Sequence, residues 1–153
     1  MSVSVQAEPF DLAAEMAALT EGNRDIGAVV SFTGLVREMT QAGPITEMAL
    51  EHYPGMTERA LEQIVDEARA RWPLQGVRLI HRFGPMSPGE GIVLVLAASR
   101  HRQAAFEAAE FLMDYLKTKA PFWKKEAAAG GDAQWVDARE SDDHAAARWE
   151  KPL

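Results

Sequence analysis

Apolar positions repeat along the chain with two periods, one helical and one extended. The helical period predicts amphipathic helices over residues 12–22, about 57–72, about 102–119 and 141–149. Asp11 is suited to cap the first of these helices, and Ser141 or Asp142 the last. Pro73 and Pro121 stop the second and third helices, because proline lacks the backbone N–H that a helix interior needs.

The extended period predicts strands between these helices. They cover residues 27–37, 45–53, 77–83, 92–98, 122–127 and 134–139. The segment 92–98 is apolar throughout, which is typical of a central strand covered on both faces. The segment 77–83 alternates and predicts one better-buried face, and the last two strands predict a hairpin across AAAGGDA. This order predicts a single α+β domain over residues 1–153, with helices packed on a largely antiparallel sheet.

Composition excludes several classes of function. Asp and Glu number 23 against 16 Lys and Arg, and this net charge of −7 argues against non-specific binding of nucleic acid or of an anionic membrane. The absence of cysteine excludes a disulfide, a thiolate nucleophile and a cysteine-ligated metal. No signal-peptide pattern or long apolar run is present, so a cytoplasmic protein is expected.

No motif in the chain predicts a cofactor or a metal. The sequence has no phosphate-binding glycine loop, no dinucleotide fingerprint and no pair of histidines with a carboxylate at metal-ligand spacing. A lone histidine on a strand, such as His52 or His81, is more often a structural residue than a ligand. We therefore expect neither a cofactor nor a metal site.

Positive charge is concentrated in one short stretch of this acidic chain. Residues 116–126 read LKTKAPFWKKE and hold four of the five lysines, namely Lys117, Lys119, Lys124 and Lys125. Lys117 falls in the last turn of a predicted helix and Lys124 in the strand that follows, so the two can converge. Convergence would suit acid–base chemistry or the binding of a small anion. The plainer interpretation is that helix-end lysines complement the helix dipole.

Strand alternation divides the second half of this stretch between two faces. Phe122, Lys124 and Glu126 are predicted on one face, and Trp123 and Lys125 on the other. The alternative to a binding role is an edge strand that lysines protect from pairing with another chain.

A second basic group stands where a buried strand meets a helix. Residues 99–102 read SRHR, and a helix N-terminus presents free N–H groups with a partial positive charge. His101 and Arg102 therefore suggest a phosphate or carboxylate site, and the alternative is a solvated loop whose arginines pair with nearby acids. Arg37, at the end of the first predicted strand, can also reach an anion, although an ordinary surface arginine fits equally.

Several segments combine these features in one fixed order. They are GAVVSFTGLVR, LEHYPGMTERAL, SRHR, FEAAEFLMDYLKTKAPFWKKE and WVDARESD. The ordered set resembles the catalytic (large) subunit of molybdopterin synthase over nearly the whole chain, and residues 114–124 are its most specific part. The resemblance implies an α/β-hammerhead-type α+β fold and a homodimer within a heterotetramer. It also implies a partner, a small ubiquitin-like sulfur carrier that ends in a Gly-Gly thiocarboxylate.

The resemblance further implies a sulfurtransferase that converts cyclic pyranopterin monophosphate into molybdopterin by adding two sulfurs as a dithiolene. It implies catalytic roles for Lys117 and Lys124. The implied substrate-binding residues are Leu35, Val36, Arg37, His101, Arg102, Lys117, Lys124, Lys125, Glu126 and Arg139.

Within this set, Arg37, His101 and Arg102 are expected to hold the phosphate together, while the lysines meet the carrier tail. The division of roles between Lys117 and Lys124 stays open, as does whether Arg139 acts within its own subunit or across the dimer. Two other functions compete with catalysis. One is a module that binds a phosphorylated metabolite without turnover, and the other is a structural dimerisation domain.

Overall fold

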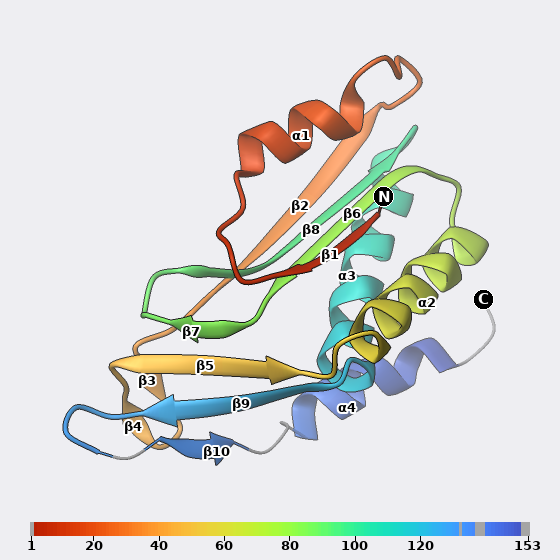
Figure 1. Ribbon diagram of the computed structural model, residues 1–153. Helices are drawn as coiled ribbons and strands as arrows, with labels where there is room; N and C mark the ends of the chain where they lie inside the picture. Colours follow the sequence, from red (N-terminus) through yellow and green to blue (C-terminus); the bar gives the residue numbers. More distant parts are fainter. Residues whose placement is uncertain (1, 132, 137–139, 151–153) are drawn as a thin grey trace.

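Sheets and helices form separate layers in this α+β fold, which confirms the predicted class (Figure 1). The structure is a computed structural model, and it describes residues 2–131, 133–136 and 140–150. Its helices are α1 (Leu12–Thr20), α2 (Met56–Arg71), α3 (Arg102–Lys119) and α4 (Glu140–Ala147), followed by the short 3₁₀ helix η1 (Arg148–Glu150). Among the described helices none is both long and apolar enough to cross a membrane.

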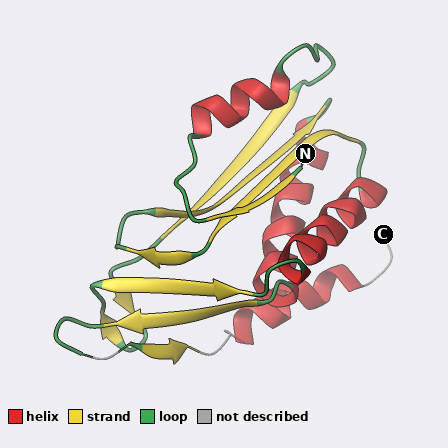
Figure 2. Cartoon of the chain, viewed as in Figure 1, coloured by secondary structure: helices red, strands yellow, loops and turns green. Residues whose placement is uncertain are grey.

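The larger sheet has the strand order β1-β6-β8-β2. Its strands are β1 (Val3–Gln6), β2 (Ala28–Leu35), β6 (Leu74–Arg82) and β8 (Gly91–Ser99). The central strand β8 pairs antiparallel with both β2 and β6, whereas β1 pairs with β6 in parallel, Val3 opposite Leu79. Helix α1 covers one face of the sheet, and α2 and α3 cover the other (Figure 2). Because both faces of the sheet are covered, β6 is buried on both sides. The prediction of one better-buried face for this strand was therefore incomplete.

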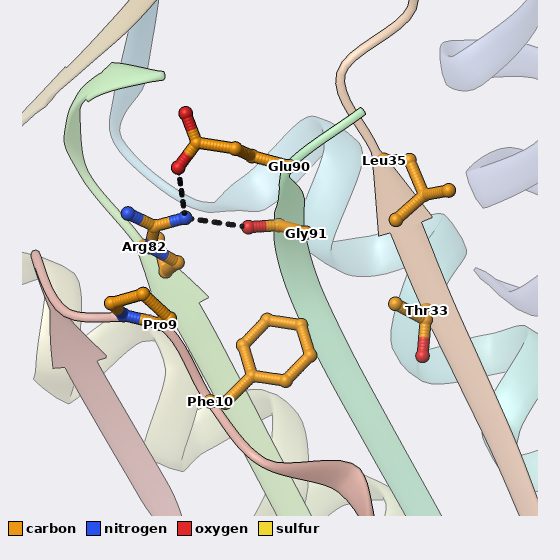
Figure 3. A pocket seen from close by; sticks show the side chains of 7 residues that line it. All are labelled: Pro9, Phe10, Thr33, Leu35, Arg82, Glu90 and Gly91. Atoms are coloured by element: carbon orange, nitrogen blue, oxygen red, sulfur yellow. Dashed lines mark hydrogen bonds and ion pairs between the residues drawn. The ribbon is translucent and has the colours of Figure 1, made fainter. Parts of the chain in front are cut away.

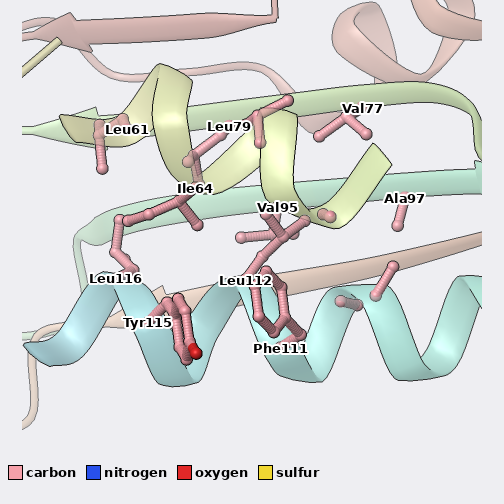
Figure 4. Close-up of a cluster of buried hydrophobic side chains, with 14 of the residues drawn as sticks. Leu61, Ile64, Val77, Leu79, Val95, Ala97, Phe111, Leu112, Tyr115 and Leu116 are labelled. Atoms are coloured by element: carbon pink, nitrogen blue, oxygen red, sulfur yellow. The ribbon is translucent and has the colours of Figure 1, made fainter. Parts of the chain in front are cut away.

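The main core lies between this sheet and the helices α2 and α3 (Figure 4). The predicted apolar stripe of α2 faces inward with α3 residues and alternate sheet residues, including Leu61, Ile64, Ala68, Leu79, Val95, Phe111, Leu112 and Leu116. Full burial of one such side chain contributes roughly 1.5–3 kcal/mol. This packing fixes α3 along the sheet, and so it also fixes where the two ends of α3 lie.

The smaller sheet has the order β10-β9-β5-β7, and all its pairs are antiparallel. Its strands are β5 (Glu47–His52), β7 (Gly84–Met86), β9 (Phe122–Ala127) and β10 (Gln134–Val136); a ribbon of β3 (Met39–Thr40) and β4 (Gly43–Pro44) stands beside it. The predicted hairpin is confirmed as β9 and β10 up to Val136, and residues 137–139 of its second predicted strand lie outside the described residues. The strand β7 was not predicted, because Gly84 and Pro85 are typical of a turn.

Helix boundaries follow the predicted signals at most ends. The Asp11 carboxylate accepts a hydrogen bond from the Ala14 N–H at 3.1 Å and caps α1. Helix α3 ends at Lys119, and Ala120 before Pro121 is extended. The expectation that Ser141 or Asp142 caps the last helix was wrong, because α4 begins at Glu140 and both residues lie inside it.

Candidate functional site

Two of the predicted catalytic and binding side chains share one face of β9. The ammonium Nζ of Lys124 lies 3.8 Å from the carboxylate Oε2 of Glu126, two residues further along the strand. The Glu126 side chain is only 10% exposed, while that of Lys124 is 37% exposed. A carboxylate with little access to water interacts more strongly with a nearby cation than an exposed one does. Glu126 is therefore placed to orient Lys124.

The opposite face of β9 carries Lys125, as strand alternation predicted. Its Nζ lies 4.2 Å from the centre of the Trp135 ring and 3.4 Å from the Glu51 carboxylate. Trp123, on the same face, approaches the Tyr53 ring at 6.4 Å. Within one chain Lys125 is thus directed away from Lys124 and Glu126, and its contact with a substrate stays a prediction.

Lys117 lies in the last turn of α3, close to a buried histidine that the sequence marked only as structural. Burial lowers the pKa of His81 to about 4, and the charge of Lys117 acts in the same direction. The His81 ring stacks on Phe122, with ring centres 3.8 Å apart. Phe122 therefore contacts a ring on which the charge of Lys117 acts, and Lys124 follows Phe122 on the same face of β9.

The segment SRHR divides into two parts in the structure. The Ser99 hydroxyl is buried and donates to the Pro73 carbonyl at 2.9 Å, and Arg100 pairs with Asp25 at 3.0 Å. His101 is the N-cap residue of α3 but its side chain makes no capping hydrogen bond, and Arg102 is the first helical residue. Both are exposed. The solvated-loop interpretation thus holds for Arg100, while His101 and Arg102 stand at a helix N-terminus that attracts anions.

The structure separates these two basic groups within one chain. Arg102 and Lys117 stand at opposite ends of α3, and the helical rise puts them ~22 Å apart along its axis. Strands β2 and β8 are antiparallel, so that Ala28 lies opposite Ser99 while Leu35 lies opposite Gly91. Arg37, just after β2, therefore lies at the end of the sheet away from Arg102. The expectation that Arg37 joins His101 and Arg102 within one chain was wrong.

Leu35 and Val36 have different surroundings although they are neighbours. Leu35 is exposed and lines a cavity of about 350 Å³, together with Pro9, Phe10, Thr33, Arg82, Glu90 and Gly91 (Figure 3). Val36 is buried in a small apolar cluster with Ile45, Met48, Leu50 and Met86. Any contact of Val36 with a substrate would therefore be made by its backbone or after local movement.

Arg82 is the buried cation of this cavity, and the sequence did not single it out. Its guanidinium donates to the carbonyl oxygens of Ala7 and Gly91 at 2.9–3.0 Å and to Glu90 at 3.2 Å. The Ser87 N–H, and then Arg82, hold the pKa of Glu90 below its usual range. Arg82 thus fastens the segment after β1 to the start of β8, and the cavity holds none of the predicted basic residues.

Arg139 lies outside the described residues, so its predicted role is not placed by the structure. The chain beyond it is anchored on α3, where the Asp114 carboxylate accepts from the Arg148 guanidinium at 2.9 Å and from the Trp149 indole at 2.7 Å. Throughout the described ranges, no three His, Asp or Glu side chains gather as the ligands of a metal would.

Comparison with known proteins gives matches that extend over almost the entire chain. The family described as "MoaE protein" matches residues 5–119. A protein of Mesorhizobium japonicum named "Molybdopterin synthase catalytic subunit" is 58% identical over 149 residues, which cover 97% of this chain and 92% of the relative.

Solved structures agree with this match. The "Molybdopterin biosynthesis MoaE protein" from Burkholderia ambifaria superposes with a TM-score of 0.83 at 49% identity, covering 99% of both chains. A chain of the "Protein-protein complex of subunit 1 and 2 of Molybdopterin-converting factor" from Helicobacter pylori has a TM-score of 0.70 at 20% identity, covering 90% of both chains. At that identity the second likeness bears on the fold alone.

Proposed function

The chain belongs to the MoaE family, the catalytic subunits of molybdopterin synthase, and we propose that it acts in the cytoplasm as a sulfurtransferase. Its donor is the C-terminal thiocarboxylate of a small ubiquitin-like carrier subunit. Its acceptor is cyclic pyranopterin monophosphate, on which two transferred sulfurs form the molybdopterin dithiolene. The chain contains no cysteine, which fits a reaction whose sulfur arrives on another protein.

The observation that carries this proposal is the Lys124–Glu126 pair on the face of β9 that begins with Phe122, whose ring stacks on His81, the histidine on which the charge of Lys117 acts. When sulfur leaves the thiocarboxylate, negative charge develops on oxygen, and fixed ammonium groups stabilise it. The same groups can bind the carrier carbonyl or move protons to and from the pterin. Glu126 orients Lys124 for these steps.

A homodimer would complete the site, because one chain keeps its two cationic groups ~22 Å apart along α3. In a twofold dimer whose α3 helices run antiparallel, Arg102 of one copy approaches Lys117 of the other. Two exposed aromatic side chains support an interface formed by α3 and the edge strand β2. They are Phe32 on β2 and Phe106 on α3, which are 41% and 60% exposed. The phosphate would then bind His101 and Arg102 of one copy, beside the lysines of the other.

Purified protein tests the function directly when it is mixed with thiocarboxylated carrier and cyclic pyranopterin monophosphate. Each thiocarboxylate holds one sulfur, so formation of one molybdopterin should consume two loaded carriers. A carrier without its last two glycines should give no turnover. Binding of the precursor without product would favour the metabolite-binding module, and binding of neither ligand would favour the dimerisation domain.

Arg102→Ala should weaken binding of the precursor without weakening binding of the carrier. A charge-assisted hydrogen bond to phosphate contributes roughly 1.5–3 kcal/mol, so the precursor Kd should rise by about one to two decades. Calorimetric titration of both ligands into both proteins measures this. Arg100→Ala is the matched control at the same junction, since Arg100 pairs with Asp25. If Arg102→Ala instead loses the carrier and still binds the precursor, the carrier and not the precursor binds at Arg102.

A further inference from the structure

Two histidines and two phenylalanines form a ring cluster where the two sheets meet. His81 comes from β6 of the larger sheet, whereas His52 and Phe122 come from β5 and β9 of the smaller one. Phe122 stacks on His81 at 3.8 Å with an angle of 19° between the planes, and His52 lies 6.2 Å from Phe122 and 4.4 Å from Phe83. The cluster therefore ties β9, the strand of Lys124, to the larger sheet.

Hydrogen bonds fix the orientation of both imidazole rings. His81 Nδ1 lies 2.9 Å from the Arg82 carbonyl oxygen, which can only accept, so Nδ1 carries the proton. His52 Nδ1 lies 3.1 Å from the Thr57 hydroxyl, which already donates to the Tyr53 carbonyl at 2.8 Å. His52 therefore also donates from Nδ1. Neither ring can turn over without losing its partner.

The surroundings of His81 keep its ring uncharged beside a cation. Its side chain is 7% exposed, and burial lowers its pKa to about 4, with the charges of Lys117 and His52 acting in the same direction. A neutral ring can lie near the Lys117 ammonium without repelling it. At neutral pH His81 is thus an uncharged ring in a fixed position, and it does not act as an acid.

The chain between Lys117 and Lys124 is short, and Phe122 within it packs against the ring of His81. Helix α3 ends at Lys119, the Phe122 N–H donates to the Ala120 carbonyl at 2.9 Å, and β9 begins at Phe122. The side chain of Phe122 therefore acts together with the pairing of β9 to β5 in setting how β9 leaves the helix. Its position against the larger sheet is set by the ring of His81.

We propose that His81 is a positioning residue for the sulfur transfer: through its stack on Phe122 it holds the Lys124 face of β9 at a fixed place relative to Lys117. This inference rests on the proposed function and deepens it. His81 touches no substrate in this scheme, and its contribution is the alignment of two lysines that do. Displacement of a reacting group by about 1 Å can cost as much as 10²-fold in rate, so loss of the support should appear mainly in kcat.

Two apolar substitutions that both fill the site distinguish the effect of the stacked ring from the effect of burying any apolar side chain. His81→Phe keeps an aromatic ring for Phe122, whereas His81→Leu does not. We expect His81→Leu to lower kcat by about 10-fold or more with each KM within about 3-fold, and His81→Phe to stay within about 3-fold of the wild type in both constants. Ile80→Val, next along β6 with its side chain on the α1 face, is the control for a general loss of packing and should leave kcat unchanged.

The wild type measured beside these variants keeps the two hypotheses apart. A wild type that forms no molybdopterin contradicts the proposed function. An active wild type with a His81→Leu variant of equal kcat overturns the positioning role. So does a His81→Phe variant as slow as His81→Leu, because the stacked ring would then not be what matters.

Discussion

Lys117→Ala and Arg102→Ala, each nearly inactive by itself, should recover about a quarter of wild-type turnover when the two chains are mixed as dimers. Loss of an acid–base group costs Lys117→Ala at least about 10²-fold in rate. Random mixing makes half of the dimers mixed, and each mixed dimer keeps one intact site, formed by Lys117 of one chain and Arg102 of the other. Turnover is measured below the precursor Kd, where the Arg102 defect is fully expressed, after the mixture has been unfolded and refolded.

Two controls give this result its meaning. Lys119→Ala removes a cation from the same last turn, where Lys119 lies 5.2 Å from the Tyr115 ring, and it should remain active. Lys117→Ala should lose no more than about 1 kcal/mol of stability, as for a surface contact with the helix dipole. If the mixture is no more active than the mean of its parents, the two residues serve from the same chain or in different sites.

Acid should weaken the folded state through His81 by about 3 kcal/mol between pH 7 and pH 4. The pKa of His81 is lowered from 6.5 to about 4 in the folded protein. Below pH 6.5 the His81 imidazole is therefore protonated in the unfolded chain, whereas in the folded protein it stays neutral down to about pH 4. Full stability is present above pH 6.5, and this contribution is lost as the pH falls toward 4.

The contribution of His81 is isolated by comparison with His81→Phe, which cannot take up the proton. Urea unfolding of both proteins at pH 7 and pH 4 gives four free energies of unfolding. The carboxylates titrate in both proteins and cancel in the difference. The wild type should lose about 3 kcal/mol more than the variant. Equal losses would mean that water reaches the ring and that His81 is not held neutral by burial.

Local patterns predicted the helices of this protein well. The stripe of Leu61, Ile64 and Ala68 marks the inner face of α2, and the proline after Ala120 marks the end of α3. These features depend on residues near each other in the sequence, where spacing and backbone restriction suffice. The strand β1 was not predicted, because its short segment is stabilised by a partner far along the chain.

The candidate site was harder to predict than the fold. Alternation placed Lys124 and Glu126 together correctly, since both lie on one strand. Helix length alone implies that Arg102 and Lys117 are far apart, yet the expected phosphate site ignored the antiparallel course of β2 and so grouped Arg37 with Arg102. The stack of His81 on Phe122 joins two sheets, and no local pattern predicts a contact of that kind.

The parallel pairing of β1 with β6 also has a consequence for how the chain acquires its structure during synthesis. Val3 lies opposite Leu79, and β8, which carries both β2 and β6, is made later still. In a nascent chain that is synthesised at about 5–20 residues per second, β1 and β2 therefore have no strand partners for several seconds. Contacts so distant in sequence slow the folding of a domain. The first strands thus present unpaired edges on the ribosome until their partners have been made.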